Sequence, residues 1–339
     1  MYTSGIDQHK RDSVITTYDT AGERLRQVRL PNHRAAISRY FASFPGPHQA
    51  VVETTGRWYW LSDLLTTLGV ELTLAHAKAL KAIAYAKVKT DPIDSNTLAV
   101  LHQAGLIPVA HMISPELRAQ RDLLRTRLRL VAKRTSCRNS VHRLLEKFNV
   151  RTVAELEPLY QLQAACHEEQ IALLDAQRKR LERELNPSLL PTPDIQRLLW
   201  IPGIGKLTAC TLYLEIDGIA RFPSDKRFVS YCRLVPGAAN SGGRTRHRSG
   251  SKDGNRYLKL AFSTAAVRAI QYYPEIRTWF RRLARRKNPK VARTLVAKEL
   301  ARIVYQVLTT QTAFTGQFKG QPLSRRKQSQ WPRLASPDA

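Results

Sequence analysis

Four acidic residues stand where their carboxylates could gather at one metal site. Asp91 and Asp94 lie three residues apart in KTDPIDS, and Pro92 fits the first turn of a helix, where proline is tolerated. Residues at this spacing share one helical face. Asp7 in SGIDQHK and Glu53 in AVVETTG each end an apolar, strand-like run. The four carboxylates are therefore expected to bind a hard divalent cation such as Mg²⁺, which prefers oxygen ligands, at a metal-dependent phosphodiester site.

A second candidate for chemistry is a serine in a segment rich in glycine and arginine. Ser241 stands in NSGGRTRHRSGSKDGNRYLK, among guanidinium groups that can stabilise negative charge on a phosphate. It is therefore a candidate nucleophile for strand transfer. The segment is expected to be a flexible loop whose backbone can come close to phosphates. Ser249 and Ser251 compete on the same grounds, and the alternative reading is a basic surface loop without chemistry. The basic residues expected to hold nucleic acid here are Arg244, Arg246, Arg248, Lys252 and Arg256.

The composition points to a polyanionic partner. The 339 residues include 55 Lys plus Arg against 27 Asp plus Glu, giving a formal net charge of +28. Nucleic acid is the expected partner, and a membrane surface is the rival. No run of about 18 apolar residues and no signal-peptide core occur, so we expect a soluble cytoplasmic protein without membrane association. The four cysteines lack any CxxC spacing, so buried free thiols are expected, with neither zinc nor disulfides.

The first 113 residues are expected to form an α/β domain. Short alternating runs over residues 5–31 predict an antiparallel meander of three strands, followed by a helix. The run QAVVET, a helix over 58–68 and the run VELTLAH then predict alternating strands and helices. This order, with acids at the strand ends, is the layout of RNase H-like folds.

Residues 114–186 are expected to form a long helical arm. Leucines at heptad-like steps predict two helices that fold back as an antiparallel coiled coil or provide a dimerisation surface. Arginines between them, including Arg125 and Arg129, either contact nucleic acid or form a solvated helix face.

Residues 187–314 are expected to form a mainly helical domain after a proline-rich linker at 186–194. The sequence IPGIGK resembles a helix-hairpin-helix element, whose backbone N–H groups can hold a phosphate; a purely structural helix turn is the alternative. Residues 315–339 are polar and expected to be disordered. Further contacts to nucleic-acid backbone are expected from Lys10, Lys206, Arg281, Arg282, Arg285, Arg286 and Lys287.

Taken in order, these motifs resemble the DEDD transposases of bacterial insertion sequences, a family that also includes a pilin-gene invertase. GIDQHK, VVETTG and KTDPIDS match the N-terminal signature of that family. IPGIGKLTA, FPSDKRFVSYCRLVPG and NSGGRTRHRSGSKDGNRYLK match its C-terminal signature. The resemblance places the acidic tetrad on Asp7, Glu53, Asp91 and Asp94, and the nucleophilic serine on Ser241.

The resemblance also implies an activity and partners. Members join a RuvC-like domain to a separate transposase domain that holds the serine, and the tetrad of one subunit faces the serine of another. The chain is thus expected to be a Mg²⁺-dependent recombinase that cleaves and exchanges donor and target DNA through a phosphoserine. A structured noncoding bridge RNA is its expected guide, and a tetramer built from dimers acting at the bacterial nucleoid is its expected assembly.

Two other functions remain open from the residues. The first is a junction resolvase or nuclease that uses water, with Ser241 only contacting phosphate. The second is a non-catalytic nucleic-acid scaffold, which the charge and the helical arm would support. Four converging carboxylates argue against the scaffold, because a pure binder gains nothing from acidic groups near DNA.

Overall fold

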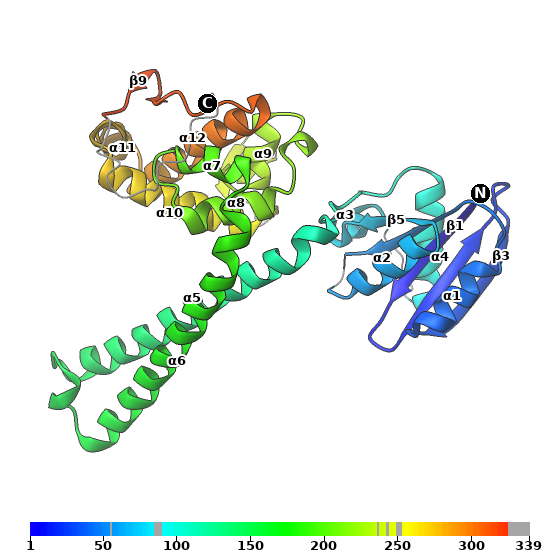
Figure 1. Ribbon diagram of the computed structural model, residues 1–339, viewed down its shortest axis with the longest axis horizontal. Helices are drawn as coiled ribbons and strands as arrows, with labels where there is room; N and C mark the ends of the chain where they lie inside the picture. The colour runs from blue at the N-terminus through cyan, green and yellow to red at the C-terminus, as the bar shows by residue number, and fades with distance from the viewer. Residues whose placement is uncertain (55, 85–89, 236, 242–243, 249–252, 325–339) are drawn as a thin grey trace. The chain divides into compact units, whose positions relative to one another are not determined.

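The computed structural model describes residues 1–54, 56–84, 90–235, 237–241, 244–248 and 253–324, with the backbone alone described for 237–241 and 244–248. The chain divides into two compact units, Met1–Met112 and Ile113–Ala339 (Figure 1). The first is a mixed α/β unit and the second is mostly helical, so the expected α/β-plus-α character is confirmed. Among the described helices, none has both the length and the apolar content needed to cross a bilayer.

The first unit contains a five-stranded sheet in the order β3-β2-β1-β4-β5. The first three strands form the expected antiparallel meander, whereas β4 runs parallel to β1 and β5 runs parallel to β4. The strands are β1 (Tyr2–Gln8), β2 (Asp12–Tyr18), β3 (Arg24–Pro31), β4 (His48–Glu53) and β5 (Val70–Ala75). The helices are α1 (Arg34–Ala42), α2 (Trp58–Thr67), α3 (Ala77–Ile83) and α4 (Asp91–Gln103).

Helices cover both faces of this sheet. Helix α4 approaches β1 so closely that a Cβ at Gly5 would lie 2.0 Å from the carbonyl oxygen of Ser95. Successive residues of a strand face opposite sides, so Ser4 faces away from α4. On that side its hydroxyl lies 2.5 Å from the Thr17 hydroxyl, which in turn lies 2.6 Å from the hydroxyl of Tyr40 in α1. The glycine thus allows α4, and with it Asp91 and Asp94, to lie directly on the central strand.

The second unit begins with two long helices, α5 (Pro115–Phe148) and α6 (Pro158–Leu189), joined through the short 3-10 helix Val153–Glu155. Ion pairs link Arg127 with Glu182 and Arg134 with Asp175. As the residue numbers rise along α5 they fall along α6, so the two helices form an antiparallel pair. This pair has the antiparallel arrangement expected of the arm, and Asn149 ends α5 with a left-handed φ of 51°.

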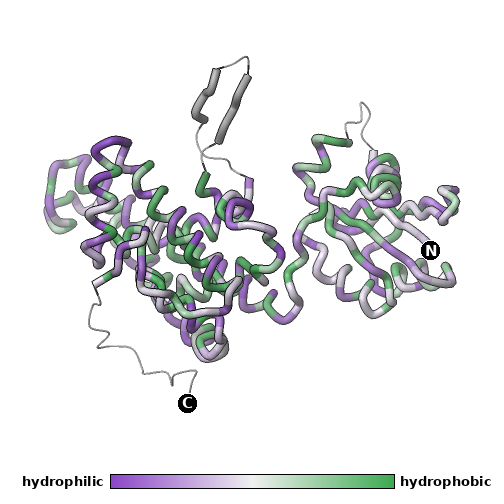
Figure 2. The backbone as a smooth tube through the Cα atoms, turned by 90° about the horizontal axis from the view of Figure 1, so that it is seen from above, coloured by the Kyte–Doolittle hydropathy of each residue, from purple (hydrophilic) through white to green (hydrophobic). Residues whose placement is uncertain are grey.

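The helical core of the second unit lies between the remaining helices and the near ends of α5 and α6. Buried side chains include Leu124 of α5, Leu185 and Leu189 of α6, and Phe262 of α10. In Figure 2 hydrophobic and hydrophilic stretches alternate along these helices, as expected for helices with one buried face. The helices are α7 (Pro193–Leu199), α8 (Lys206–Ile216), α9 (Asp225–Tyr231), α10 (Arg256–Tyr272), α11 (Pro274–Arg286) and α12 (Pro289–Thr310).

Two segments differ from their expected form. Helix α6 continues through Pro187 to Leu189, so it occupies part of the proline-rich stretch expected to be a linker. Burial of Leu185 and Leu189 offsets the helix-breaking effect of the proline. Within the segment expected to be disordered, Gln317–Phe318 and Gln321–Pro322 pair as β8 and β9, and Phe318 is buried against Trp279. Residues 325–339 lie outside the described residues.

The glycine-rich segment that carries Ser241 contains an antiparallel hairpin. Strands β6 (Gly237–Ser241) and β7 (Arg244–Arg248) pair in register, with Ser241 opposite Arg244. The sequence predicts a flexible loop here, whereas the structure contains two paired strands. A Gly-Gly dipeptide between strands is a strong hairpin signal, and it outweighs the low strand propensity of the flanking glycines.

Candidate active site

Regular elements bring the acids of the first unit to one side of the sheet. Asp7 lies in β1 and Glu53 ends β4, while Asp91 and Asp94 occupy the first turn of α4 after the N-cap Thr90. Ile6 pairs with Val52, so Asp7 and Glu53 are the next residues on two neighbouring parallel strands. Both follow by two positions a residue that packs against α4, so both belong to the face that α4 covers.

Within this region a histidine lies between two of the acids. The Nε2 atom of His9 is 3.1 Å from Oδ2 of Asp7 and 3.2 Å from Oδ1 of Asp91. Ligand atoms of Asp7, His9 and Asp91 all lie within 4.8 Å of one another. These three side chains, half-buried together, form a group that could hold a metal ion, and we call them the acid–histidine cluster.

An arginine from β3 also holds Asp91. The Arg29 guanidinium donates one hydrogen bond to Oδ2 of Asp91 and another, at 2.7 Å, to Oδ2 of Asp12. The hydrogen bond from Arg29 lowers the pKa of Asp91, and the charges of His9 and Arg29 act in the same direction, against the opposing effect of partial burial. Asp91 is therefore held in its ionised, ligand-competent form.

The structure brings together only part of the expected tetrad. Among the described residues, Asp7 and Asp91 are the two tetrad members that belong to the acid–histidine cluster. Glu53, on the neighbouring strand, and Asp94, in the same helical turn as Asp91, do not belong to it. His9, Arg29 and Asp12 are not among the site residues that the sequence predicts. The place of His9 could have been predicted, because His9 follows Asp7 by two residues and so continues the alternation of β1. The place of Arg29 could not, because it depends on the pairing between β2 and β3.

The donor set fits a divalent cation. Two carboxylates from different elements approach the same histidine. Glu53 ends the neighbouring strand β4, and Asp94 lies in the same helical turn as Asp91. Carboxylate oxygens are the ligands that hard divalent ions prefer. The imidazole of His9 widens the choice toward Mn²⁺, because nitrogen ligands suit transition metals better than Mg²⁺. Asp7 and Asp91 are thus the residues best placed to hold such an ion.

The second unit places Ser241 at the end of β6, next to the turn of the hairpin. In the antiparallel register Ser241 pairs with Arg244, Ala239 with Arg246 and Gly237 with Arg248. Paired residues occupy one face of a sheet and alternate residues of a strand share that face. The position of Ser241 is therefore on the same hairpin face as those of the three arginines. Lys252, Ser249 and Ser251 lie outside the described residues.

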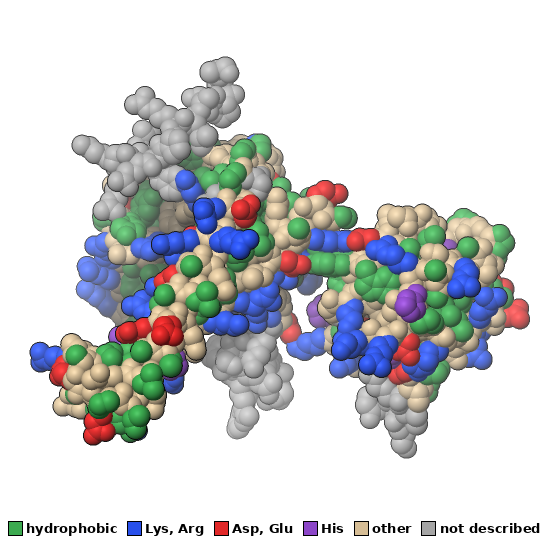
Figure 3. Space-filling view, turned by 60° about the horizontal axis from the view of Figure 1, so that its bottom comes forward, with side chains coloured by type: hydrophobic (Ala, Val, Ile, Leu, Met, Phe, Trp, Pro, Cys, Tyr) green, Lys and Arg blue, Asp and Glu red, His purple; other side chains and the backbone are tan. Residues whose placement is uncertain are grey.

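Other basic residues expected to contact nucleic acid lie at the surface. Lys and Arg side chains are spread widely over the face shown in Figure 3. The four arginines at the end of α11 are all exposed. The exposed members of the expected set are Lys10, Arg129, Lys206, Arg256, Arg281, Arg282, Arg285, Arg286 and Lys287.

Arg125 has a different environment from the one expected of it. Its guanidinium makes a bidentate ion pair with Glu215, with hydrogen bonds of 2.6 and 2.7 Å to a carboxylate whose side chain is 1% exposed. Burial alone would lower the pKa of Arg125, but the hydrogen bonds and charge of Glu215 outweigh it and raise the pKa. Arg125 therefore has a structural role in the fold, and a contact of Arg125 with nucleic acid stays a prediction.

The glycine turn before α8 has a packing role, which agrees with the structural alternative for this turn. Gly203 has a φ of +77°, and a Cβ there would lie 2.1 Å from the carbonyl oxygen of Ala265 in α10. The turn therefore needs glycine to lie against α10, whatever it binds.

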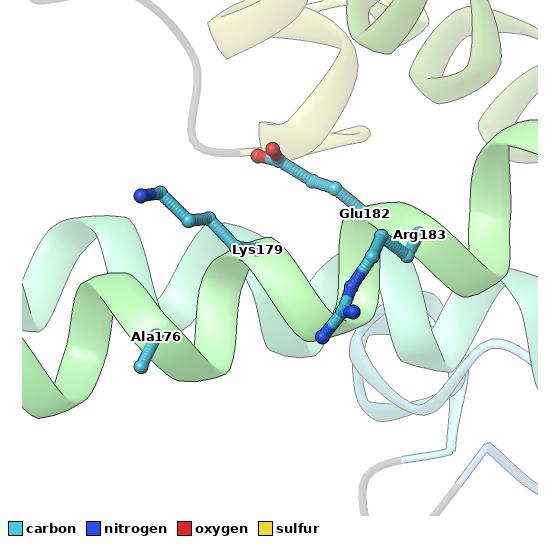
Figure 4. A pocket seen from close by; sticks show the side chains of 4 residues that line it. All are labelled: Ala176, Lys179, Glu182 and Arg183. Atoms are coloured by element: carbon cyan, nitrogen blue, oxygen red, sulfur yellow. The ribbon is translucent and has the colours of Figure 1, made fainter.

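A surface depression of about 570 Å³ lies along α6 and is lined by Ala176, Lys179, Glu182 and Arg183 (Figure 4). Glu182 accepts hydrogen bonds from Arg127 and Arg178, so its charge is already paired. The lining is basic and suits a polyanion better than an apolar ligand.

Comparisons with known proteins define the class to which this fold and site belong. A DEDD transposase model matches residues 4–150, the part of the chain that contains all four acids. A second model, described as the IS116/IS110/IS902 transposase family, matches residues 195–281, which include Ser241. The chain therefore carries both domains of the IS110/IS116/IS902 family and belongs to the transposases of insertion sequences.

Relatives with curated descriptions agree with this class. The transposase for insertion sequence element IS1328 of Yersinia enterocolitica is 26% identical over 334 residues, covering 92% of this chain and 98% of that protein. A protein of Pseudomonas aeruginosa named "Probable family 20 transposase" is 27% identical over 308 residues, covering 83% of this chain and 89% of the relative. The similarity thus spans both units.

Proposed function

We propose that the protein is a DNA recombinase in which the acids of the first unit and Ser241 of the second take part in one phosphoryl-transfer reaction. The observation that carries this proposal is the acid–histidine cluster, in which Asp7 and Asp91 from separate elements approach one imidazole. An RNase H-like arrangement of the first unit is part of the proposal, supported by acids at the ends of β1 and β4 and at the start of α4.

Ser241 acts as the nucleophile. Its Oγ forms a bond to the scissile phosphorus as the bond from phosphorus to the deoxyribose oxygen breaks, and the leaving oxygen takes up a proton to become a hydroxyl. The phosphoserine diester keeps the energy of the broken bond. A strand hydroxyl can then attack it, release the serine and reseal the DNA without ATP.

The remaining residues of the site bind the cation, keep Asp91 ionised and bind the DNA strand. Asp7, Glu53, Asp91 and Asp94 bind the divalent cation, proposed to be Mg²⁺, which would supply Lewis-acid polarisation of the phosphate. Arg29 keeps Asp91 ionised. The arginines of β7, on the same hairpin face as Ser241, hold the strand near the serine.

Partners follow from the surface and the family. The exposed arginines of α11 bind backbone phosphates of donor and target DNA without reading sequence. Sequence choice is assigned to a structured guide RNA, in keeping with charge-rich surfaces that suit backbone contacts. The working assembly at the nucleoid is a tetramer built from dimers.

The proposal is tested with purified protein, RNA transcribed from the flanks of its gene, Mg²⁺ and end-labelled donor and target DNA on a denaturing gel. Wild type should give a protease-sensitive DNA adduct, and Ser241→Ala should give none. Ser249→Ala and Ser251→Ala are matched controls that should keep the adduct. Cleavage by both wild type and Ser241→Ala without an adduct would mean a nuclease that uses water. Omitting the RNA tests guidance separately.

A further inference from the structure

A buried carboxylate in the second unit joins three elements at the base of the serine hairpin. Glu215, in the last turn of α8, accepts two hydrogen bonds from Arg125 of α5 and one of 2.6 Å from Nδ2 of Asn255. Helix α8 packs against both α5 and α10, and Figure 1 shows it beside α10. Asn255 is the first residue before α10 and follows the segment that contains β6 and β7.

Asn255 is fixed from several directions. Its side-chain oxygen accepts hydrogen bonds from the backbone N–H groups of Tyr257 and Leu258, which caps α10. Its own backbone N–H donates to the carbonyl of Tyr231 at 2.7 Å. Nε of Arg233 donates to the carbonyl of Gly254, also at 2.7 Å. The two chain ends that lead into and out of the serine segment are thus tied together beside Glu215.

Gly254 makes this junction tight. It has a φ of +99°, and a Cβ there would lie 2.3 Å from the carbonyl oxygen of Tyr231. The backbone after the hairpin therefore lies directly on the end of α9. Arg125 also stacks on Tyr257, with its Cζ 4.7 Å from the ring centroid.

The cost of this arrangement indicates a purpose beyond stability. Glu215 and Asp217 stand at the C-terminal end of α8, whose last turn contains no basic residue, so both acids oppose the helix dipole. A buried ion pair is often no more stabilising than apolar residues of the same size, and its best-attested use is to fix one geometry.

We propose that Glu215, with Arg125 and Asn255, is a positioning clamp that sets the base of the Ser241 hairpin relative to the arm formed by α5 and α6. The role assigned to the clamp rests on the proposed function of Ser241. Glu215 is a positioning residue, because it acts on the serine through Asn255 and touches no substrate. Movement of α5, such as binding of nucleic acid to the arm would cause, is transmitted through Arg125 to the hairpin.

The clamp is tested by hydrogen–deuterium exchange of the full-length protein, read by mass spectrometry over peptides covering residues 237–248. Glu215→Gln removes the charge that Arg125 binds. Asn255→Asp keeps an equally good helix cap but faces Glu215 with a like charge. Both should increase exchange of the hairpin by about tenfold or more, the factor expected for losing a hydrogen bond to a charged group.

Two controls separate positioning from general stability. Val296→Ala removes buried side-chain volume from the same core, and Asp217→Asn changes the neighbouring acid that accepts hydrogen bonds from Ser114. Neither should loosen the hairpin selectively. Arg125→Lys, which keeps the charge, should restore part of the protection that Arg125→Ala loses. Equal exchange of the hairpin in Glu215→Gln, Asn255→Asp and Val296→Ala would overturn the clamp.

The same variants distinguish failure of the clamp from failure of the proposed function. With the adduct assay, Glu215→Gln and Asn255→Asp should lower the yield of the serine adduct about tenfold while DNA binding is unchanged. Absence of any adduct from wild-type protein would remove the catalytic role of Ser241, and the exchange result would still decide whether the clamp holds the hairpin. If these variants loosen the hairpin but give as much adduct as wild type, the clamp is only a structural contact, and its positioning role is overturned.

Discussion

The acid-bearing side of the sheet and the serine hairpin are positioned by different means. Asp7 and Asp91 belong to a regular strand and a regular helix, and a glycine allows α4 to lie directly on β1. Ser241 stands at the end of a short two-stranded hairpin, whose base is held by a buried ion pair between helices distant in sequence. A sheet and a helix packed directly on it set the acids, whereas a few side-chain contacts at the base of the hairpin set the serine.

Because of this difference, we expect the acids to be held rigidly and the serine hairpin to be adjustable. Acids placed by a sheet and a packed helix keep their spacing, as a site for a cation requires. A serine on a hairpin can be moved by its anchors, which suits the proposed nucleophile, because that nucleophile would attack and later be released. The predictions below test each side, from the largest expected effect to the smallest.

Asp7→Asn or Glu53→Gln should abolish strand cleavage and leave DNA and RNA binding nearly intact. The expected loss is on the order of a thousandfold or more, because a catalytic cation supplies several kcal/mol of transition-state stabilisation. Cleavage assays with Mg²⁺ and with a chelator, together with binding titrations, measure this. Asp19→Asn, in a surface turn of the same unit, is the control. Normal cleavage by either tetrad variant would remove the metal site from the mechanism.

Gly5→Ala and Gly203→Ala should each destabilise one unit by about 1–3 kcal/mol or more through overpacking. The added methyl groups would meet the carbonyls of Ser95 and Ala265, respectively. Chemical denaturation measures the loss. Gly56→Ala and Gly205→Ala, where a Cβ meets nothing within 4 Å, are matched controls and should cost under about 1 kcal/mol. Equal stabilities within a pair would contradict the close approach of α4 or of the glycine turn.

Arg29→Gln should move the acidic limb of the cleavage profile to higher pH. Arg29 lowers the pKa of Asp91, so its removal raises that pKa and protonates the carboxylate at a pH where wild type keeps it ionised. Arg24→Gln, on the same strand, should leave the limb in place. Cleavage rates measured across the acidic range test this. If the acidic limbs of wild type and Arg29→Gln coincide, Arg29 does not keep Asp91 ionised.

His48 should make the first unit less stable in acid. Burial lowers the pKa of His48 to about 4 from the usual 6.5. Between these two pH values the imidazole is protonated in the unfolded chain and neutral in the folded chain. Its contribution is complete above the unfolded pKa and is lost as the pH falls from 6.5 toward 4, by up to about 1.4 kcal/mol per pH unit. Thermal unfolding between pH 7 and pH 5 should show a smaller drop in Tm for His48→Gln than for wild type. Identical drops would contradict the buried, neutral imidazole.

The elements of the first unit can be predicted from the sequence better than the contacts between them. Alternation locates β1 to β3, and the Asp-Pro step locates the start of α4, so the elements that carry Asp7 and Asp91 follow from the sequence alone. The place of Arg29 does not, because its contact with Asp91 depends on which residues of two strands lie opposite one another. Local signals specify elements, and they do not specify register.

In the helical unit the missing information is tertiary. Arg125 looks like any other arginine of a basic helix, and only the fold places it against Glu215, ninety positions along the chain. Burial of Leu189 likewise extends α6 past Pro187, against local propensity. One signal was available: acids at the C-terminal end of α8 oppose its dipole, and such a conflict indicates a partner elsewhere in the chain.

The most direct test is to map the covalent adduct. Wild-type and Asp7→Asn proteins are incubated with DNA, guide RNA and Mg²⁺, digested with protease and nuclease, and analysed by mass spectrometry. The account predicts a nucleotide on Ser241 in wild type and none in Asp7→Asn. A nucleotide on another residue, or the same yield on Ser241 in Asp7→Asn, would show that the acids and the serine do not share one reaction.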